Sequence, residues 1–318
     1  MKNNIECNNQ PCEQLAKQMP TGKEYLQQLQ QTEQTEIHEV FSAVMQICQA
    51  VQENGGTAFI VGGCVRDLVA GGKQPKDFDL EIFDQNADQI QTVLLTLFSP
   101  ERVKAETGKA FGVTKVMLGN GMDIDISLPR KDSKNGNGNG HKDFDIKHDP
   151  QMSQLEASKR RDFTMNSLSW DPLLEENNIF DYFDGVRHLQ EKRLKITDAK
   201  TFGDDPLRVL RAVQFAGRHE LTIDESDIPI YQQSCQYLST LPSSRLVEEW
   251  KKLFLKSRKP SFGLKAAADL GLFKYIHPQF QYLIKNNNKN HKWDKTLLVV
   301  DRAADMVRRQ NLPDEQIW

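Results

Sequence analysis

Two aspartates stand two residues apart in the stretch FIVGGCVRDLVAGGKQPKDFDLEIF, which runs from Phe59 to Phe83. On a strand, side chains at i and i+2 point to the same face, so Asp77 and Asp79 lie close together. Neighbouring carboxylates resist ionisation unless a cation joins them, and hard oxygen ligands favour Mg²⁺. The spacing therefore predicts a divalent metal site. A solvated strand face carrying two aspartates is the alternative.

The residues before this pair are suited to bind phosphate. Gly62-Gly63 breaks an apolar strand and begins a short helix. Glycine lets a phosphate approach the backbone, and a helix N-terminus offers free N–H groups and a positive dipole. Arg66 lies one turn further on and can add charge-assisted hydrogen bonds. Together with two Mg²⁺ ions, such a site can hold an attacking hydroxyl and a triphosphate in line.

A set of alternating strands and amphipathic helices must position these groups. The hydrophobic periodicity predicts helices over residues 37–51, 65–70 and 85–98, and strands over 57–61, 77–83, 111–118 and 122–128. The last two strands are joined by Gly119-Asn120-Gly121, which is typical of a hairpin. Asp123 and Asp125 share one face of the second hairpin strand. Either is a candidate third carboxylate, and a solvated face is the alternative.

The second half of the chain is predicted to be helical. A polar loop is expected over Lys131–Lys142, and helices over 206–218, 244–257, 262–270 and 295–309. The fold class is therefore α+β, with a small mixed sheet in the head followed by all-helical neck and body domains. The predicted boundaries are a mobile extension at 1–36, a catalytic head at 37–170, a neck at 171–236 and a body at 237–318.

Composition bounds the class of protein. The chain has 318 residues, a net charge of −3 and five cysteines without zinc spacing. No apolar run reaches the roughly 18 residues that span a membrane. We therefore expect a cytoplasmic protein with reduced thiols and no membrane partner. The sequence does not determine the oligomeric state. A nucleic acid would have to bind a local basic patch.

Further motifs follow in order along the chain. RRDFTMN covers residues 160–166, DYFDG covers 181–185, and DDPLR covers 204–208. With GGCVRD and DFDLEIF, this series resembles the class II tRNA nucleotidyltransferase/poly(A) polymerase family, whose head has the polymerase-beta-like nucleotidyltransferase fold. The resemblance covers roughly residues 59–259. It implies that Arg161 and Asp162 contact the sugar and phosphates of a nucleotide, that residues 181–185 form a hinge, and that residues 204–208 begin the base-reading helix.

The residue types of the last motif fit base recognition. Cytosine and adenine each present an amino donor beside a ring-nitrogen acceptor, and one carboxylate with one guanidinium complements both edges. Uracil and guanine present a carbonyl acceptor beside a ring N–H donor, which would leave the carboxylate and the guanidinium without partners. Asp205 and Arg208 are therefore the predicted base readers, with Arg211 as a further nucleotide contact. A helix cap with an intrahelical ion pair is the alternative. Asp204 replaces the family's usual Glu, and Gln214 replaces a frequent Arg.

The C-terminal region predicts an RNA surface. Residues 245–265 carry seven basic side chains against two acidic ones, which suits an RNA backbone. The resemblance places a tRNA acceptor end there. It also predicts no working His-Asp-type hydrolase, because Lys295 stands where relatives have a ligand histidine. The leading hypothesis is Mg²⁺-dependent addition of CMP and AMP, from CTP and ATP, to tRNA 3′ ends.

Alternatives to this function stay open. They are a poly(A) polymerase, a split enzyme that adds only CC or only A, and a non-catalytic RNA-binding module. Residues 109–116 lack the R-F-x-x-x-H-V-like stretch that is usual in the bacterial poly(A) polymerases. Asp77 and Asp79 argue against a pure binding module, because clustered negative charge repels RNA phosphates.

Overall fold

The computed structural model describes residues 20–32, 34–71, 75, 77–105, 113–119, 121–134, 144–176, 178–287 and 291–310. The chain forms two compact units. Unit 1 comprises Met1–Gly136 and Phe144–Gln190, and unit 2 comprises Asn137–Asp143 and Glu191–Trp318. The first unit therefore extends 20 residues beyond the predicted head boundary at 170. The rest of the predicted neck, residues 191–236, falls together with the predicted body in unit 2.

Unit 1 is built on a mixed seven-stranded sheet with the strand order β3-β4-β5-β2-β1-β8-β9. All neighbouring strands are antiparallel except β2 and β5, which run parallel. The strands are β1 Thr57–Val61, β2 Phe78–Phe83, β3 Val103–Ala105, β4 Val113–Met117, β5 Asp123–Ser127, β8 Ser169–Trp170 and β9 Ile179–Phe180. The predicted small mixed sheet is confirmed.

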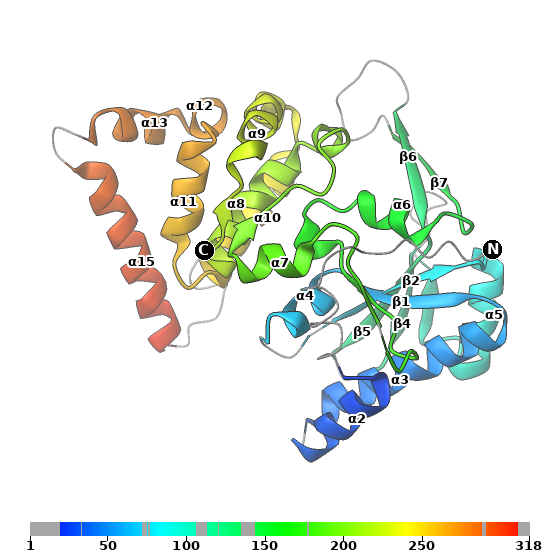
Figure 1. The fold of residues 1–318 in the computed structure, drawn as a ribbon. Coiled ribbons are helices and arrows are strands. Elements are labelled where there is room, and N and C mark those ends of the chain that lie inside the picture. The colour runs from blue at the N-terminus through cyan, green and yellow to red at the C-terminus, as the bar shows by residue number, and fades with distance from the viewer. Residues whose placement is uncertain are drawn as a thin grey trace. The chain divides into compact units, whose positions relative to one another are not determined.

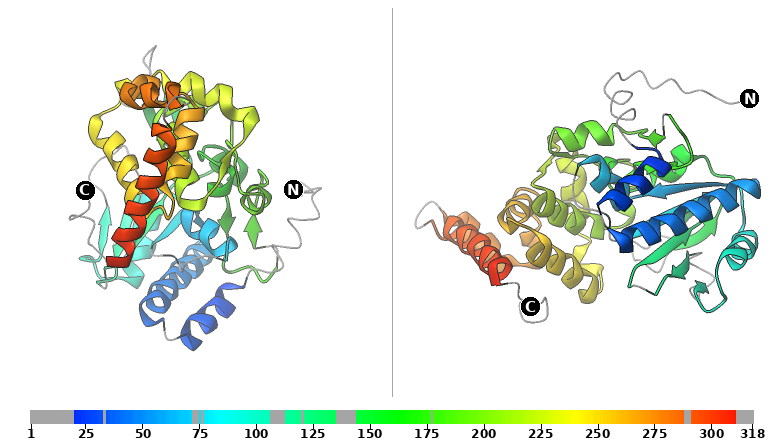
Figure 2. Two further views of the ribbon diagram at one scale, coloured as in Figure 1. Left: turned by 90° about the vertical axis from the view of Figure 1, so that its left-hand side faces the viewer. Right: turned by 90° about the horizontal axis from the view of Figure 1, so that it is seen from below.

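Two N-terminal helices pack on one face of this sheet (Figures 1 and 2). Helix α3 (Thr35–Glu53) presents Phe41, whose ring stacks on Trp170 at 5.4 Å and meets Phe78 at 5.5 Å. Helix α2 (Gly22–Gln31) packs beside α3 and buries Tyr25 and Leu29. This amphipathic helix falls within the extension predicted for residues 1–36, and the mobility of that extension stays a prediction. Residues 1–19 lie outside the described ones.

The opposite face of the sheet carries the acidic residues. Strand alternation buries Phe78, Leu80 and Ile82 on the α3 side, and so turns Asp79 and Glu81 to the other side. Part of that other face is covered by a small apolar cluster, formed by Phe59, Val61, Phe83, Met152, Ala157 and Phe180. The apolar faces of β1 and β2 thus fix which way the carboxylates point.

The remaining elements of unit 1 connect the sheet to the sequence motifs. They are α4 (Gly63–Val69), α5 (Ala87–Leu97), α6 (Gln154–Lys159), η1 (Thr164–Asn166) and α7 (Gly185–Gln190). The β4–β5 hairpin was predicted and is confirmed, although residues 111, 112 and 120 lie outside the described ones.

A second hairpin in unit 1 was missed. Strand β6 (Arg130–Lys134) pairs with β7 (Phe144–His148) over five residues on each side. The loop predicted over Lys131–Lys142 is wrong for Lys131–Lys134, which belong to β6. Lysine, aspartate and serine have low strand propensity, so backbone pairing with β7 decides this segment rather than its own side chains.

Unit 2 is mostly helical, as predicted. Its central helix α8 (Leu207–His219) packs against α10 (Ser243–Lys256) and α11 (Pro260–Asp269). A Cβ at Gly263 would lie 2.5 Å from the carbonyl oxygen of Val213, so glycine permits the close approach of α11 to α8. The other helices are η2 (Phe202–Asp204), η3 (Glu225–Asp227), α9 (Ile228–Cys235), η4 (Leu238–Thr240), α12 (Phe273–Ile276), α13 (Pro278–Lys285) and α15 (Lys292–Gln310).

The expectation of an all-helical neck is wrong in two places. Strand β9 (Ile179–Phe180) lies within it and belongs to the sheet of unit 1. Two short parallel strands, β10 (Arg193–Leu194) and β11 (Thr222–Ile223), pair at the start of unit 2. Each is two residues long, too short to show an alternating pattern in the sequence. Cys48, Cys64 and Cys235 are free and buried. No helix in the described part of the chain is both long and apolar enough to cross a membrane.

Candidate active site

The acidic site of unit 1 is a row across two parallel strands. Asp79 of β2 and Asp125 of β5 are direct Cα partners, so their side chains leave the same face. Asp77 precedes β2 and is exposed. Among the described residues, no hydrogen bond or ion pair reaches the Asp79 carboxylate. Oδ1 of Asp125 is buried without an aligned hydrogen bond. The structure thus brings Asp125, rather than Asp123, beside Asp79.

The electrostatics of this row favour a bound cation. Burial raises the pKa of Asp79 above its ordinary value; the Arg161 guanidinium opposes this rise, and the charges of Asp125 and Asp77 add to it. A divalent ion would offset the cost of burying the Asp79 charge and would reduce the repulsion among the carboxylates. Carboxylate oxygens are the ligands that Mg²⁺ prefers, so the site fits that ion. Among the described residues, no three Asp, Glu, His or Cys side chains already converge as a metal site.

Space beside Asp79 is kept open by a glycine. Gly62 has φ 76° and ψ −135°, a conformation that side chains resist. A Cβ at Gly62 would lie 3.7 Å from both Oδ2 of Asp79 and Nη1 of Arg161, and would narrow the space between them. Arg161 also pairs with Glu81 at 3.3 Å. A guanidinium therefore lies beside the acidic row. Metal binding by Asp77 and Asp79 and phosphate binding by Arg161 stay predictions.

Two other predicted nucleotide contacts take part in an internal network. Arg66 is 4% exposed; its Nη1 donates to Asn166 Oδ1 at 2.8 Å and its Nε to Asp67 at 2.8 Å. Asn166 in turn donates to Asp162 Oδ1 at 2.9 Å, and so does the backbone N–H of Phe163. The chain Arg66–Asn166–Asp162 ties α4 to the RRDFTMN motif. Direct contact of Arg66, Asp162 or Gly63 with a nucleotide stays a prediction.

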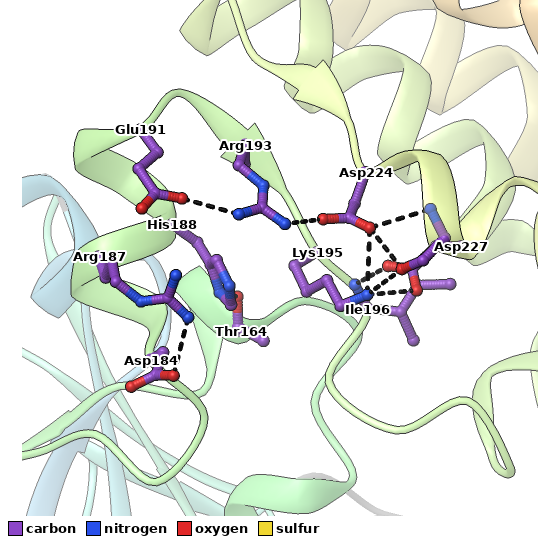
Figure 3. Close-up of polar contacts among 11 residues, drawn as sticks. Thr164, Asp184, Arg187, His188, Glu191, Arg193, Lys195, Ile196, Asp224 and Asp227 are labelled. Atoms are coloured by element: carbon purple, nitrogen blue, oxygen red, sulfur yellow. Dashed lines mark hydrogen bonds and ion pairs between the residues drawn. The ribbon is translucent and has the colours of Figure 1, made fainter. Parts of the chain in front are cut away.

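The DYFDG segment fixes helix α7 to the same motif. The Asp181 carboxylate accepts hydrogen bonds from the backbone N–H groups of Phe183, Gly185 and Val186 and so caps the helix. His188 Nδ1 lies 2.9 Å from Thr164 Oγ1 (Figure 3), and both side chains are buried. These contacts hold α7 against η1 within unit 1. A hinge role for residues 181–185 stays a prediction.

The base-reading candidates lie at the start of α8 in unit 2. Asp205 Oδ1 accepts the backbone N–H of Leu207 at 3.1 Å and so caps the helix. Its Oδ2 pairs at 3.3 Å with Arg245 of α10. Arg208 Nη1 donates to the carbonyl of Thr201 at 3.2 Å. The carboxylate is 37% exposed, so it is both held in place and open to a ligand.

Helix α8 carries arginines on its half-exposed side. Arg211 and Arg218 lie 5.5 and 5.8 Å from the ring centre of Phe215. Gln214 is buried and accepts a hydrogen bond from Arg218 at 3.2 Å. Arg208, Arg211 and Arg218 follow the spacing of one helix face. Contact of Arg208 and Arg211 with a nucleotide stays a prediction.

An ion network with two buried carboxylates and two partly exposed cations anchors the start of unit 2 beside α8 (Figure 3). The Lys195 ammonium donates to Asp224 at 3.2 Å and to Asp227 at 2.8 Å, and Arg193 donates to Asp224. Burial alone would raise the pKa of Asp224, but hydrogen bonds from Ser226, Arg193 and Lys195 outweigh it and hold that pKa well below its ordinary value. The network joins β10 to the segment that follows β11.

This network makes the stability of unit 2 depend on pH. Because the folded-state pKa of Asp224 is lowered, its stabilisation is fully present above the unfolded value of about 4. It is lost progressively as the pH falls from there through the lower folded-state pKa. We expect Asp224→Asn to lower the free energy of unfolding by about 2 kcal/mol at pH 7. The difference from wild type should shrink towards pH 3. Urea titrations at both pH values measure it; Asp305→Asn, an exposed pair with Arg308, is the control.

Six of the seven basic side chains of segment 245–265 divide into two groups. Arg245 pairs with Asp205, and Lys252 pairs with the buried Glu249 at 2.7 Å. Exposed basic side chains gather where α10 ends and along α11; they are Lys256, Arg258, Lys259 and Lys265. The second group is the part of the segment that suits an RNA backbone.

The sequence did not predict the contacts of two residues of the site, Lys115 and Arg245, with the predicted carboxylates. Lys115 of β4 is the Cα partner of Asp125. The hairpin predicted at residues 119–121 could have indicated this pairing, because the position of the turn sets which residues of the two strands face each other. The Lys115 ammonium lies 3.0 Å from Oδ1 of Asp125 and 3.6 Å from Oδ2 of Asp123. Arg245 was counted only as part of a basic segment. It reaches Asp205 across 40 residues, which no local pattern reveals.

Known proteins match both units of this chain. A sequence profile described as the poly(A) polymerase head domain matches residues 58–195. A second, described as the probable RNA- and SrmB-binding site of polymerase A, matches residues 223–283. Together they cover more than half of the chain. The chain belongs to the class II tRNA nucleotidyltransferase/poly(A) polymerase family. The fold agrees, since the Thermotoga maritima CCA-adding enzyme complexed with tRNA superposes with a TM-score of 0.62 at 23% identity, over 80% of this chain and 58% of that one.

Members of the family with different names are similar to this chain. Poly(A) polymerase I of Haemophilus influenzae is 27% identical over 83% of this chain and 58% of its own length. The CCA-adding enzyme of Limosilactobacillus reuteri is 29% identical over 74% of this chain and 54% of its own length. The chain thus spans little more than half the length of these relatives. Family membership alone does not choose between their activities.

Proposed function

We propose that this protein adds CMP and AMP, taken from CTP and ATP, to the 3′ end of tRNA and releases pyrophosphate. The observation that carries this is the pairing of Asp79 with Asp125 beside the open space at Gly62 and the Arg161 guanidinium. Metal-binding carboxylates next to a cation and a glycine-lined space suit transfer of a nucleotide from a triphosphate. The similarity to CCA-adding enzymes supports the choice of substrate.

In this proposal each group of unit 1 has a defined task. Asp77, Asp79 and Asp125 hold Mg²⁺, with Asp125 as the third carboxylate because it is the Cα partner of Asp79. Bound Mg²⁺ lowers the pKa of the RNA 3′-hydroxyl and screens the triphosphate. Gly62 and Gly63 let the phosphates approach the backbone. Arg161 binds a phosphate oxygen.

Unit 2 supplies selection and RNA binding in this proposal. Asp205 accepts the amino group of cytosine or adenine, and Arg208 donates to the adjacent ring nitrogen. Arg211 binds phosphate from the same side of α8. The exposed lysines and arginine at 256–265 hold the tRNA backbone. A cytoplasmic location is part of the proposal.

The second candidate is poly(A) polymerase activity. The similarity to the Haemophilus poly(A) polymerase, which extends over 83% of this chain, favours it. Against it stands the missing R-F-x-x-x-H-V-like stretch in residues 109–116. A split enzyme that adds only CC or only A uses the same residues.

Primer extension separates these activities. The protein is incubated with Mg²⁺, one labelled NTP and tRNA transcripts that end before CCA, after C or after CC. We expect CMP on the first two transcripts and AMP only on the third. CMP alone or AMP alone would identify a split enzyme, and long A tails would identify a poly(A) polymerase. Binding of tRNA without any incorporation would leave only a binding module.

A further inference from the structure

A lysine continues the acidic row of the sheet. Asp79 of β2 is the Cα partner of Asp125 of β5, and Asp125 is the Cα partner of Lys115 of β4. Directly paired residues leave the same face of a sheet. A cation of the chain itself therefore lies next to the two carboxylates on adjacent strands.

The contacts of this lysine go to carboxylate oxygens. Its Nζ lies 3.0 Å from Oδ1 of Asp125 and 3.6 Å from Oδ2 of Asp123. Oδ1 of Asp125 is itself buried, whereas the Asp125 side chain as a whole is 44% exposed, so the ion pair lies at the surface of the sheet. The Lys115 side chain is 34% exposed on a flexible stem, which leaves it room to move away.

A divalent ion on Asp125 would compete with that ammonium. Two cations on one carboxylate oxygen repel each other, whereas one cation there neutralises the crowded negative charge. Without a divalent ion, Lys115 offsets part of the repulsion among Asp79, Asp123 and Asp125.

We propose that the Lys115 ammonium is a built-in counter-cation of the acidic site, which a divalent ion must displace from Asp125 and which thereby sets the metal affinity. The inference rests on the proposed function only in taking Asp79 and Asp125 as metal ligands. An ordinary surface ion pair, by contrast, would affect stability slightly and metal binding not at all.

Metal binding to the protein alone tests this. Binding of Mn²⁺ is measured by the electron paramagnetic resonance signal of the free ion, without RNA or nucleotide. We expect Lys115→Met to bind Mn²⁺ about five- to tenfold more tightly than wild type, because a repelling charge is removed. Lys115→Arg keeps the charge and should stay within about twofold. Lys131→Met removes another lysine of unit 1, paired with Asp149 at 2.6 Å, and should leave the affinity unchanged.

Three outcomes would overturn the proposal. Unchanged Mn²⁺ affinity in folded Lys115→Met, shown by circular dichroism, would mean an ordinary ion pair. Weaker binding would mean that Lys115 holds the ligands in place for the metal. The third outcome is that the wild-type protein does not bind Mn²⁺, or binds it as tightly after Asp79→Asn. Either result would exclude the metal site of the proposed function, and with it the role of Lys115. The first two outcomes leave the proposed function intact.

Discussion

Replacing Asp79 with asparagine is expected to reduce nucleotide incorporation at least about a thousandfold while tRNA binding is retained. Asparagine has nearly the same shape but removes one charge from the oxygen row, and with it a ligand for the metal. Loss of incorporation without loss of RNA binding distinguishes an enzyme from a binding module. Filter binding of labelled tRNA and single-turnover incorporation of CMP measure the two properties.

The stability of this variant provides a second test of the same assignment. The folded-state pKa of Asp79 is raised, so its ionised form costs stability at every pH above the unfolded value. Asp79→Asn should therefore unfold at a temperature no lower than that of wild type. Asp88→Asn, on the exposed first turn of α5, is the control and should leave incorporation unchanged. A less stable Asp79→Asn would indicate that the carboxylate supports the fold rather than the chemistry.

The second large effect is expected at Asp205. We expect Asp205→Ala to lower kcat/KM for CTP and ATP about a hundredfold, because a charge-assisted hydrogen bond to the base is lost. UTP does not use that acceptor, so the ratio of CTP to UTP incorporation should fall by a similar factor. Steady-state incorporation of each NTP at a saturating concentration of tRNA measures both quantities. An equal loss for all four nucleotides would show that Asp205 serves only as a helix cap.

Arg245, which holds the Asp205 carboxylate, is expected to affect base selection as well, and Lys252 provides the control. Arg245 pairs with Oδ2 of Asp205 at 3.3 Å, so Arg245→Met should loosen the carboxylate and reduce selection about tenfold, with partial rescue by Arg245→Lys. Lys252→Met removes a cation from the same helix, where it pairs with Glu249 at 2.7 Å, and should not affect selection. If both variants behave alike, the effect comes from the charge of α10 and not from Asp205.

Much of the fold follows from local patterns in the sequence. The period of Val40, Phe41, Val44 and Ile47 predicts α3, and the alternation in β2 places Asp79 opposite Phe78. Strand β6 cannot be predicted from its own residues, which are polar. It is extended because its backbone pairs with β7. Strands β10 and β11 have two residues each, and an ion network holds that region together.

The site follows from the sequence only where its residues are close along the chain. Asp77 with Asp79 and Asp205 with Arg208 are each a local motif. The choice of Asp125 over Asp123 requires the parallel register of β2 and β5, which joins residues 46 positions apart. Arg245 and Lys115 acquire their partners through helix packing and strand pairing. Motif spacing therefore predicts the kind of chemistry, and tertiary contacts determine which further residues support it.

The most direct test of the central claim is the sequence of the product ends. Wild-type protein, Mg²⁺ and a tRNA transcript lacking CCA are incubated with all four NTPs at equal concentration, and the 3′ ends are sequenced. We expect most extended molecules to end in CCA and to grow no further. Ends that carry long A tracts, any mixture of the four bases, or no added nucleotide would contradict it.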